Sequence, residues 1–313
     1  MRNKFVGILA VLLLAIGFLI LNYPTLSTLY NQLHQGTVLT TYDDTVQKMN
    51  EEKKKEYWQE AKAYNERLAG TTPQLTDAFS NKGNKEDSDY NQILNLEEDT
   101  GVMGSIEIPK ISVYLPIYHG TSAEVLERGV GHMEGTSFPI GGRSTHTVLT
   151  GHRGLPSAEL FTNLDQIEEN DIFYLHILDK TLAYKVYNIE TVEPSNVESL
   201  AIQQGRDLAT LVTCTPYGIN SHRLLIHAMR VPYKGETKDA KEALKENLWQ
   251  WLLKQKTLLV SVALLLLLLI YFIIQRIKAR REKKRREMER RARRQRQIRE
   301  KGEIGRASCR ERV

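Results

Sequence analysis

The chain has 313 residues, with 43 Lys and Arg, 38 Asp and Glu, and two cysteines. Its formal charge of +5 comes from the C-terminal end, because residues 22–256 hold 23 basic and 32 acidic side chains, about −9 net. An acidic region of that size argues against a nucleic acid as partner. Two cysteines and scattered histidines, without His or Cys pairs at metal-ligand spacing, predict no disulfide framework and no metal site, and we expect no cofactor.

Two long apolar runs lie at residues 5–21 and 257–274. Each approaches the ~20 residues that a helix needs to cross a bilayer. Basic residues in segments 1–4 and 275–302 predict that both termini are cytoplasmic, which leaves the acidic region outside a cell membrane that the chain crosses twice. A cleaved signal peptide is the alternative for the first run, but no small-x-small cleavage site follows it. The basic segment after the second run is expected to contact anionic membrane lipid.

The last eleven residues, 303–313, can be back-translated codon by codon into a common sequencing adapter. We hypothesise that they are an artefact and that the natural C-terminus differs. Resequencing the locus tests this, because a genomic sequence that continues through Val313 contradicts it. Cys309 lies in this stretch and supports no inference.

A helical juxtamembrane segment is predicted over residues 22–70. Apolar side chains recur there at a spacing of three to four residues, at Trp58, Ala61, Tyr64 and Leu68. Gly and Pro at residues 70–73 end it. The polar residues 71–101 are typical of a loop, and a loop this long is usually functional or disordered.

Residues 102–234 have the pattern of short β-strands separated by turns. Expected strands include Thr145–Thr150, Ile172–Leu178, Leu182–Glu190, Leu208–Thr213 and Arg223–Val231. Many short strands within about 130 residues indicate one closed barrel or a sandwich. Residues 235–256 return to a charged, helical pattern and are expected to link this domain to the second apolar run.

Three residues form a candidate catalytic set. Cys214 lies at the end of an apolar strand and has no disulfide partner, so it is either a nucleophile or a small buried core residue. A cysteine nucleophile needs a group that takes its proton, and His152 lies where an apolar strand breaks at glycine. Arg223 is a fixed charge that could stabilise an oxyanion. The alternatives are an ordinary turn histidine and a surface arginine.

The motifs together resemble the sortase family. The sequence Thr-Leu-Val-Thr-Cys at 210–214, followed by Arg223, and Thr-Gly-His at 150–152 carry this resemblance. Wider matches at 131–137, 150–156 and 213–224, and the two apolar runs, resemble the class C sortases, which polymerise pilins in Gram-positive bacteria. The resemblance covers about residues 25–275. It implies a mainly β fold: an eight-stranded β-barrel with short helices, an N-terminal helical segment and two transmembrane helices.

The resemblance also implies a role for each candidate residue. Cys214 matches the nucleophile that attacks an LPXTG-like sorting motif between Thr and Gly and forms a thioacyl-enzyme. His152 matches the general acid/base, and Arg223 matches the residue that binds substrate and stabilises the oxyanion. The acceptor is usually a pilin lysine. The implied partners are therefore pilins or other surface proteins with a C-terminal sorting motif.

Class C sortases also carry a lid, a loop that lays an Asp-Pro-aromatic tripeptide over the active site. Leu75–Phe79 resembles this lid. We expect Asp77 to face Arg223 and Phe79 to cover Cys214. Ala78 replaces the usual proline, and because losing proline loosens the backbone, we hypothesise a weaker or more mobile lid.

Other functions remain as alternatives. A housekeeping sortase that attaches proteins to peptidoglycan is the nearest, and the second apolar run and the lid-like loop argue against it. A papain-like protease is disfavoured, because no Cys-Gly-x-Cys-Trp block is present and the histidine precedes the cysteine. A non-catalytic extracellular β-domain, used as a scaffold or for adhesion, is the last alternative. The complete Cys, His and Arg set argues against it, because a scaffold does not need these residues.

Overall fold

The computed structural model describes residues 2–71, 75–80, 89–96, 101–233, 235, 245, 248–249, 252–253 and 255–310. Within these ranges, side chains are described from Leu9 to Arg293, except those of residues 10, 11 and 257. The helices are α1 (Arg2–Lys48), α2 (Glu51–Ala69), α3 (Ala123–Arg128) and α5 (Lys256–Arg310), with short 3₁₀ turns η1 (Pro109–Ile111), η2 (Leu164–Gln166) and η3 (Glu198–Leu200). The strands are β1 (Val102–Ile108), β2 (Val113–His119), β3 (Val130–His132), β4 (Thr145–Thr150), β5 (Ile172–Ile177), β6 (Lys180–Val192), β7 (Asp207–Thr215) and β8 (His222–Val231).

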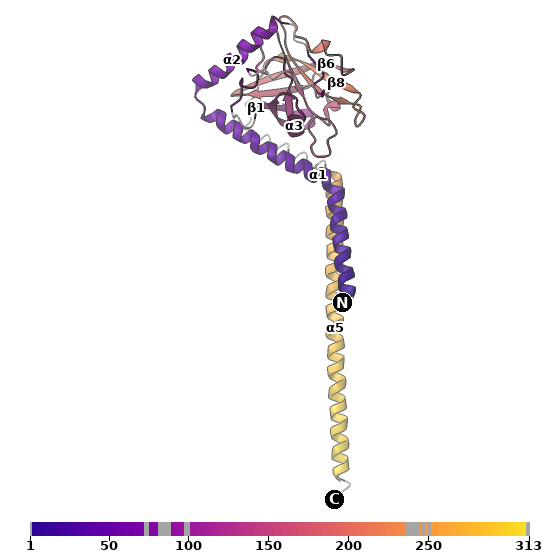
Figure 1. Cartoon of the computed structure of the whole chain (residues 1–313). Coiled ribbons are helices and arrows are strands. Elements are labelled where there is room, and N and C mark those ends of the chain that lie inside the picture. Colours follow the sequence, from indigo (N-terminus) through magenta and orange to yellow (C-terminus); the bar gives the residue numbers. More distant parts are fainter. Residues whose placement is uncertain are drawn as a thin grey trace. The chain divides into compact units, whose positions relative to one another are not determined.

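The strands close into a barrel (Figure 1). The order of the eight strands is β1-β2-β3-β4-β7-β8-β6-β5, with β5 paired to β1. Most neighbours are antiparallel, whereas β2–β3 and β4–β7 are parallel. This architecture confirms the predicted mainly β, eight-stranded barrel. Closure pairs every strand on both sides, so the barrel has no free edge.

The barrel interior is filled by alternate residues of each strand, because successive strand side chains point to opposite faces. Leu149 of β4, Leu211 of β7 and Ile226 of β8 belong to the large buried core. Their neighbours Val148 and Val212 belong to a second, smaller apolar cluster. The β4–β7–β8 part of the sheet therefore buries apolar side chains on both faces.

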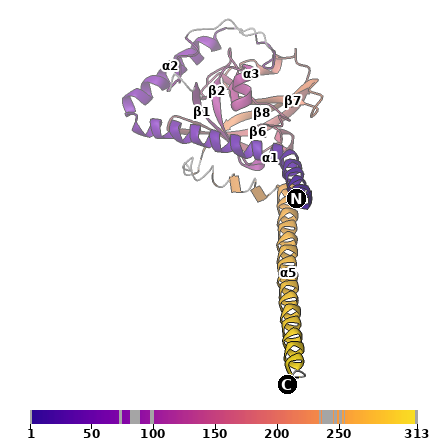
Figure 2. The same cartoon turned by 60° about the horizontal axis from the view of Figure 1, so that its bottom comes forward.

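The helices α1 and α2 pack against the barrel (Figure 2). Buried polar groups tie each helix to it. The Tyr42 hydroxyl of α1 donates to the Met103 carbonyl at 3.0 Å and accepts from the Leu178 amide at 3.0 Å. The Asn65 side chain of α2 exchanges hydrogen bonds of 3.1 and 2.7 Å with the main chain of Phe138. These contacts join the helical segment that precedes the barrel to the barrel itself.

The helices differ in detail from the expected segments. One helix, α1, runs without interruption across residues 21 and 22, where we expected a boundary, and Asn50 caps the next helix by accepting from the Lys53 amide at 2.8 Å. Of the expected loop 71–101, residues 72–74, 81–88 and 97–100 lie outside the described residues, as does most of the expected linker 235–256.

Two helices are long and apolar enough to cross a membrane by length and composition, within Leu12–Lys48 of α1 and Leu258–Arg293 of α5. The first contains the expected run near the N-terminus, and the second begins at the expected run near the C-terminus. The α5 helix forms a structural unit of its own and continues from its apolar part into the basic segment.

Candidate active site

Cys214 lies next to the last residue of β7. It is a free thiol, and its side chain is 7% exposed. Alternation along β7 puts it on the same face as Val212, whereas Leu211 points into the barrel core. The cysteine therefore belongs to the outer face of the sheet rather than to the barrel interior.

Arg223 is the direct cross-strand partner of Cys214 in the antiparallel β7–β8 pair. Directly opposed residues of such a pair have Cβ atoms about 4.5–5.5 Å apart. Nη1 of Arg223 also donates to the carbonyls of Asn220 at 3.1 Å and His222 at 3.0 Å. The hairpin thus fixes the guanidinium beside the thiol.

His152 follows the end of β4 by two residues. β4 runs parallel to β7 with Thr150 opposite Val212, and the Gly151 amide continues the pairing by donating to the Val212 carbonyl at 3.1 Å. Extending this register by two residues brings His152 level with Cys214. The three expected residues therefore gather where β4 and β7 end and β8 begins, although they are far apart in sequence.

Burial acts on the protonation of both the thiol and the imidazole. It raises the pKa of Cys214, which the Arg223 charge lowers and the Asp77 carboxylate raises. Burial also lowers the pKa of His152, opposed by the Glu127 carboxylate. In this arrangement a neutral thiol faces a neutral imidazole at neutral pH, so a proton must move before Cys214 can attack.

Residues 75–80, which we call the lid segment, lie over these side chains. Asp77 makes a bidentate ion pair with Arg223: Nε donates to Oδ1 at 2.8 Å and Nη2 donates to Oδ2 at 2.7 Å. The Phe79 ring lies 5.3 Å from the His152 ring and 5.0 Å from the Arg223 guanidinium carbon. The ring therefore contacts the two residues that flank Cys214.

The lid segment is a tight turn. The Ser80 amide donates to the Asp77 carbonyl at 2.9 Å, and the Ser80 hydroxyl donates to the same oxygen at 2.7 Å. Ala78 and Phe79 are thus the central residues of a four-residue turn, and Ala78 is at the position where proline is favoured. The Ala78 side chain is only 6% exposed.

An apolar groove lies under the lid segment, on the same outer face of the sheet as Cys214. Its buried residues, together with Ala78 of the lid segment, are Met133, Val148, Leu200, Val212 and Leu225. Leu75, Phe79, Val192 and Val197 pack against them. The lid segment therefore packs its apolar side chains onto the apolar residues of this groove.

The sequence reasoning did not identify the groove wall formed by Val197 and Leu200. Both lie in or beside η3, in a stretch between β6 and β7 too short to predict a helix or a strand. The sequence signal was a short group of apolar residues, Val197, Leu200, Ala201 and Ile202, within a polar stretch. Among the described residues no group of three or more His, Cys, Asp or Glu side chains could hold a metal ion.

Comparison with known proteins assigns the family. Residues 106–231 match the profile of the sortase domain. The sortase C structure of Streptococcus pneumoniae is 44% identical, with a TM-score of 0.58, over 64% of this chain and 100% of that chain. The chain belongs to the sortase family. The sortase C1 structure of Streptococcus agalactiae is 45% identical, with a TM-score of 0.58, over 63% of this chain and 100% of that chain.

A more distant relative is sortase D of Bacillus subtilis, 29% identical over 168 residues, 53% of this chain and 80% of that protein. The solved structures with 40–45% identity are class C sortases, as the motifs implied. As a sortase, the protein is a cysteine transpeptidase, and the scaffold-only alternative is set aside.

Proposed function

We propose that this sortase is a membrane-anchored class C enzyme that polymerises pilins through Cys214, His152 and Arg223. The observation that carries the proposal is the cross-strand pair of Cys214 and Arg223, with Arg223 held by a carboxylate from the lid segment. The structure of pneumococcal sortase C, 44% identical to this chain, was reported to give insights into catalysis and pilin substrate specificity. A lid and an apolar groove suit a long peptide substrate that enters after the lid segment leaves.

In the first half-reaction, the Cys214 thiol passes its proton to His152 and the sulfur attacks the carbonyl carbon of Thr in the sorting motif. Arg223 donates hydrogen bonds to the oxyanion that forms. His152 returns the proton to the leaving glycine amine as the C–N bond breaks. The product is a thioacyl-enzyme on Cys214.

In the second half-reaction, a lysine amine of the next pilin attacks the thioester. His152 accepts the amine proton, the C–S bond breaks, and Cys214 regains its proton as an isopeptide bond forms. While Asp77 accepts from Nε and Nη2 and two carbonyls accept from Nη1, Arg223 has only one N–H left for an oxyanion. Opening of the lid segment therefore precedes chemistry.

The test is incubation of the full chain, in lipid nanodiscs, with a pilin that bears a C-terminal sorting motif. Pilin polymers that disappear with Cys214→Ala, and with substitution of the acceptor lysine, support the proposal. A Cys214-dependent product that forms on peptidoglycan fragments, without pilin polymers, indicates the housekeeping function instead. No Cys214-dependent product on either acceptor rejects transpeptidation by this site.

We also propose that α1 and α5 both cross the cell membrane, with the barrel outside and both termini in the cytoplasm. The basic segments at 1–4 and 275–302 favour this orientation. Reporter fusions test it. A phosphatase that needs export should be active when inserted in the exposed β5–β6 turn and inactive after residue 293, and the reverse pattern contradicts the proposed topology.

A further inference from the structure

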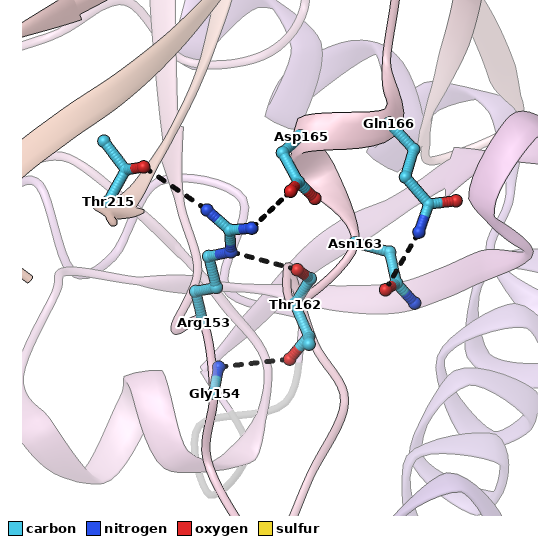
Figure 3. Close-up of polar contacts among 7 residues, drawn as sticks. All are labelled: Arg153, Gly154, Thr162, Asn163, Asp165, Gln166 and Thr215. Carbon is cyan, nitrogen blue, oxygen red and sulfur yellow. Dashed lines mark hydrogen bonds and ion pairs between the residues drawn. The ribbon is translucent and has the colours of Figure 1, made fainter. Parts of the chain in front are cut away.

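Arg153, the residue after His152, has a buried side chain with a polar partner for each of its three nitrogens. The side chain is 8% exposed. Its Nε donates to the Thr162 carbonyl at 3.1 Å, Nη1 donates to the Thr215 hydroxyl at 3.3 Å, and Nη2 is paired with the Asp165 carboxylate (Figure 3). One guanidinium thus joins two parts of the chain, and no sequence pattern indicated this role.

The first part is the loop that follows β4. The Phe161 amide donates to the His152 carbonyl at 3.0 Å, and the Gly154 amide donates to the Thr162 hydroxyl at 3.1 Å. The loop that leaves the barrel at His152 therefore returns to its own starting point. Arg153 closes it with bonds to Thr162 and Asp165 (Figure 3).

The second part is the end of β7. Thr215, which receives Nη1 of Arg153, directly follows Cys214. The loop after it also packs on Arg153, because the Tyr217 ring lies 5.8 Å from the guanidinium carbon. Gly154 has a φ of +79°, and a Cβ there would lie 3.0 Å from the same ring, so the contact needs glycine at this position.

The position of the His152 ring depends mainly on contacts of the neighbouring main chain. The ring has an aromatic neighbour in Phe79, but within the described part of the chain no side chain or carbonyl hydrogen-bonds its nitrogens. No described hydrogen bond orients the imidazole. The position of His152 therefore follows from the ring contact with Phe79 and from main-chain anchors on both sides. Before it, Gly151 bonds Val212 and Thr213 of β7, and after it the Arg153 side chain bonds Thr215 at the end of the same strand.

We propose that Arg153 is a positioning residue whose guanidinium sets the separation of His152 and Cys214. It joins the residue that follows each of them, and this inference rests on the proposed function of those two residues. Asp165 balances the charge of Arg153, so the guanidinium acts through geometry. Proton transfer needs heavy atoms within about 2.6–3.2 Å, and a misplacement of about 1 Å can cost ~10²-fold in rate.

The experiment measures cleavage of a fluorogenic Leu-Pro-Glu-Thr-Gly peptide by the full chain in nanodiscs. We expect Arg153→Ala to lower kcat by about 10–100-fold with KM changed by less than about threefold, because positioning acts on the chemical step. Arg153→Lys keeps the charge but reaches fewer acceptors, so it should recover part of the rate. Thr215→Val removes only the hydrogen bond from Arg153 to β7 and should lower kcat by about 3–10-fold.

Arg206 provides a matched control at the opposite end of β7. Its Nη1 donates to the Gln203 side chain at 2.6 Å, and its guanidinium carbon lies 5.0 Å from the Tyr187 ring. Arg206→Ala should leave kcat within about twofold, since it loses comparable contacts far from the site. The pH profile of kcat gives a second readout, which a purely structural role would leave unchanged and which Arg153→Ala should shift.

Each result has a definite meaning. Wild-type-like kcat in both Arg153→Ala and Thr215→Val overturns the inference, as does a rise in KM alone. If Arg153→Ala does not fold, an unchanged kcat in Thr215→Val is sufficient to overturn it. If the Cys214→Ala variant cleaves the peptide as fast as the wild type does, the proposed function itself is rejected. A wild-type chain that depends on Cys214 but not on Arg153 rejects only the positioning role.

Discussion

Both oxygens of the Asp77 carboxylate are bound by the guanidinium of Arg223, at 2.8 and 2.7 Å, in a pair that joins the lid segment to β8. The two side chains are 16% and 11% exposed, so water screens them little. Because Arg223 is also the cross-strand partner of Cys214, this ion pair joins residues 75–80 to the strand beside the thiol and occupies the proposed oxyanion donor.

Weakening this pair should expose the thiol. We expect Asp77→Asn to accelerate iodoacetamide labelling of Cys214 in the full chain by about 10–100-fold, since hydrogen bonds to charged groups are worth about 1.5–3 kcal/mol. Peptide mapping separates Cys214 from Cys309. The control is Glu168→Gln, which breaks the more exposed ion pair to Lys110 and should leave the labelling rate unchanged. Equal rates for wild type and Asp77→Asn contradict closure by this pair.

A proline at position 78, where this chain has alanine, should slow the labelling of Cys214. Ala78 occupies the second position of the Asp77–Ser80 turn, and within the described part of the chain its amide has no hydrogen-bond partner to lose. Ala78→Pro should stabilise the closed turn by about 0.4–1 kcal/mol, which slows Cys214 labelling about 2–5-fold. Ala78→Gly, which loosens the turn, should accelerate labelling. The same change of rate in both variants would rule out backbone stiffness as the cause.

The sequence was informative about local features of this site. Cys214 ends one apolar strand and Arg223 starts the next, so a hairpin was expected, and β7 and β8 form it. The parallel pairing of β4 with β7 had no such signal. About 60 residues separate the two strands, and a parallel contact leaves no turn motif to detect. That pairing brings His152 to Cys214, so only family resemblance could connect them beforehand.

Short and irregular elements were also beyond the sequence. β3 has only three residues, and periodicity over so few positions cannot distinguish a strand from a loop. The expected strand Leu182–Glu190 extends to Lys180 and Val192, because the turn closes at Leu178, where φ is +52°. The three partners of Arg153 come from two segments, the loop at 162–165 and the end of β7, so its role depends on tertiary structure alone.

The flat ring of Phe79 should shield the Cys214 thiol from solvent reagents better than an aliphatic side chain would. It contacts both His152 and Arg223, and such aromatic contacts are worth about 0.5–1.5 kcal/mol beyond burial. Phe79→Ala should therefore accelerate Cys214 labelling by at least about threefold, whereas Phe79→Leu should show a smaller increase. Labelling that is unchanged in Phe79→Ala would show that residues 75–80 are not a lid.

Two buried histidines should make the barrel sensitive to acid. Burial lowers the pKa of His132 to about 3 and that of His146 to about 4, from an ordinary value of 6.5. In the neutral ring, His132 Nε2 donates to the Ser137 carbonyl at 2.9 Å, and Nδ1 is an acceptor 2.9 Å from the Tyr90 hydroxyl, which also lies 3.0 Å from the His132 carbonyl. A second proton would place an uncompensated charge on a fully buried ring.

The sign of the effect follows from proton linkage. Between pH 6.5 and 4 the unfolded chain binds protons at both histidines and the folded chain does not, so the free energy of unfolding falls as the pH falls. The slope should approach about 1.4 kcal/mol per pH unit for each histidine. His146→Gln should lower stability at pH 7 and reduce the loss of Tm between pH 7 and 4, measured on the full chain by near-UV circular dichroism. The control is His34→Gln at an exposed position, which should keep the wild-type dependence of stability on pH. If both His132→Gln and His146→Gln also keep the wild-type dependence, other groups cause the acid sensitivity.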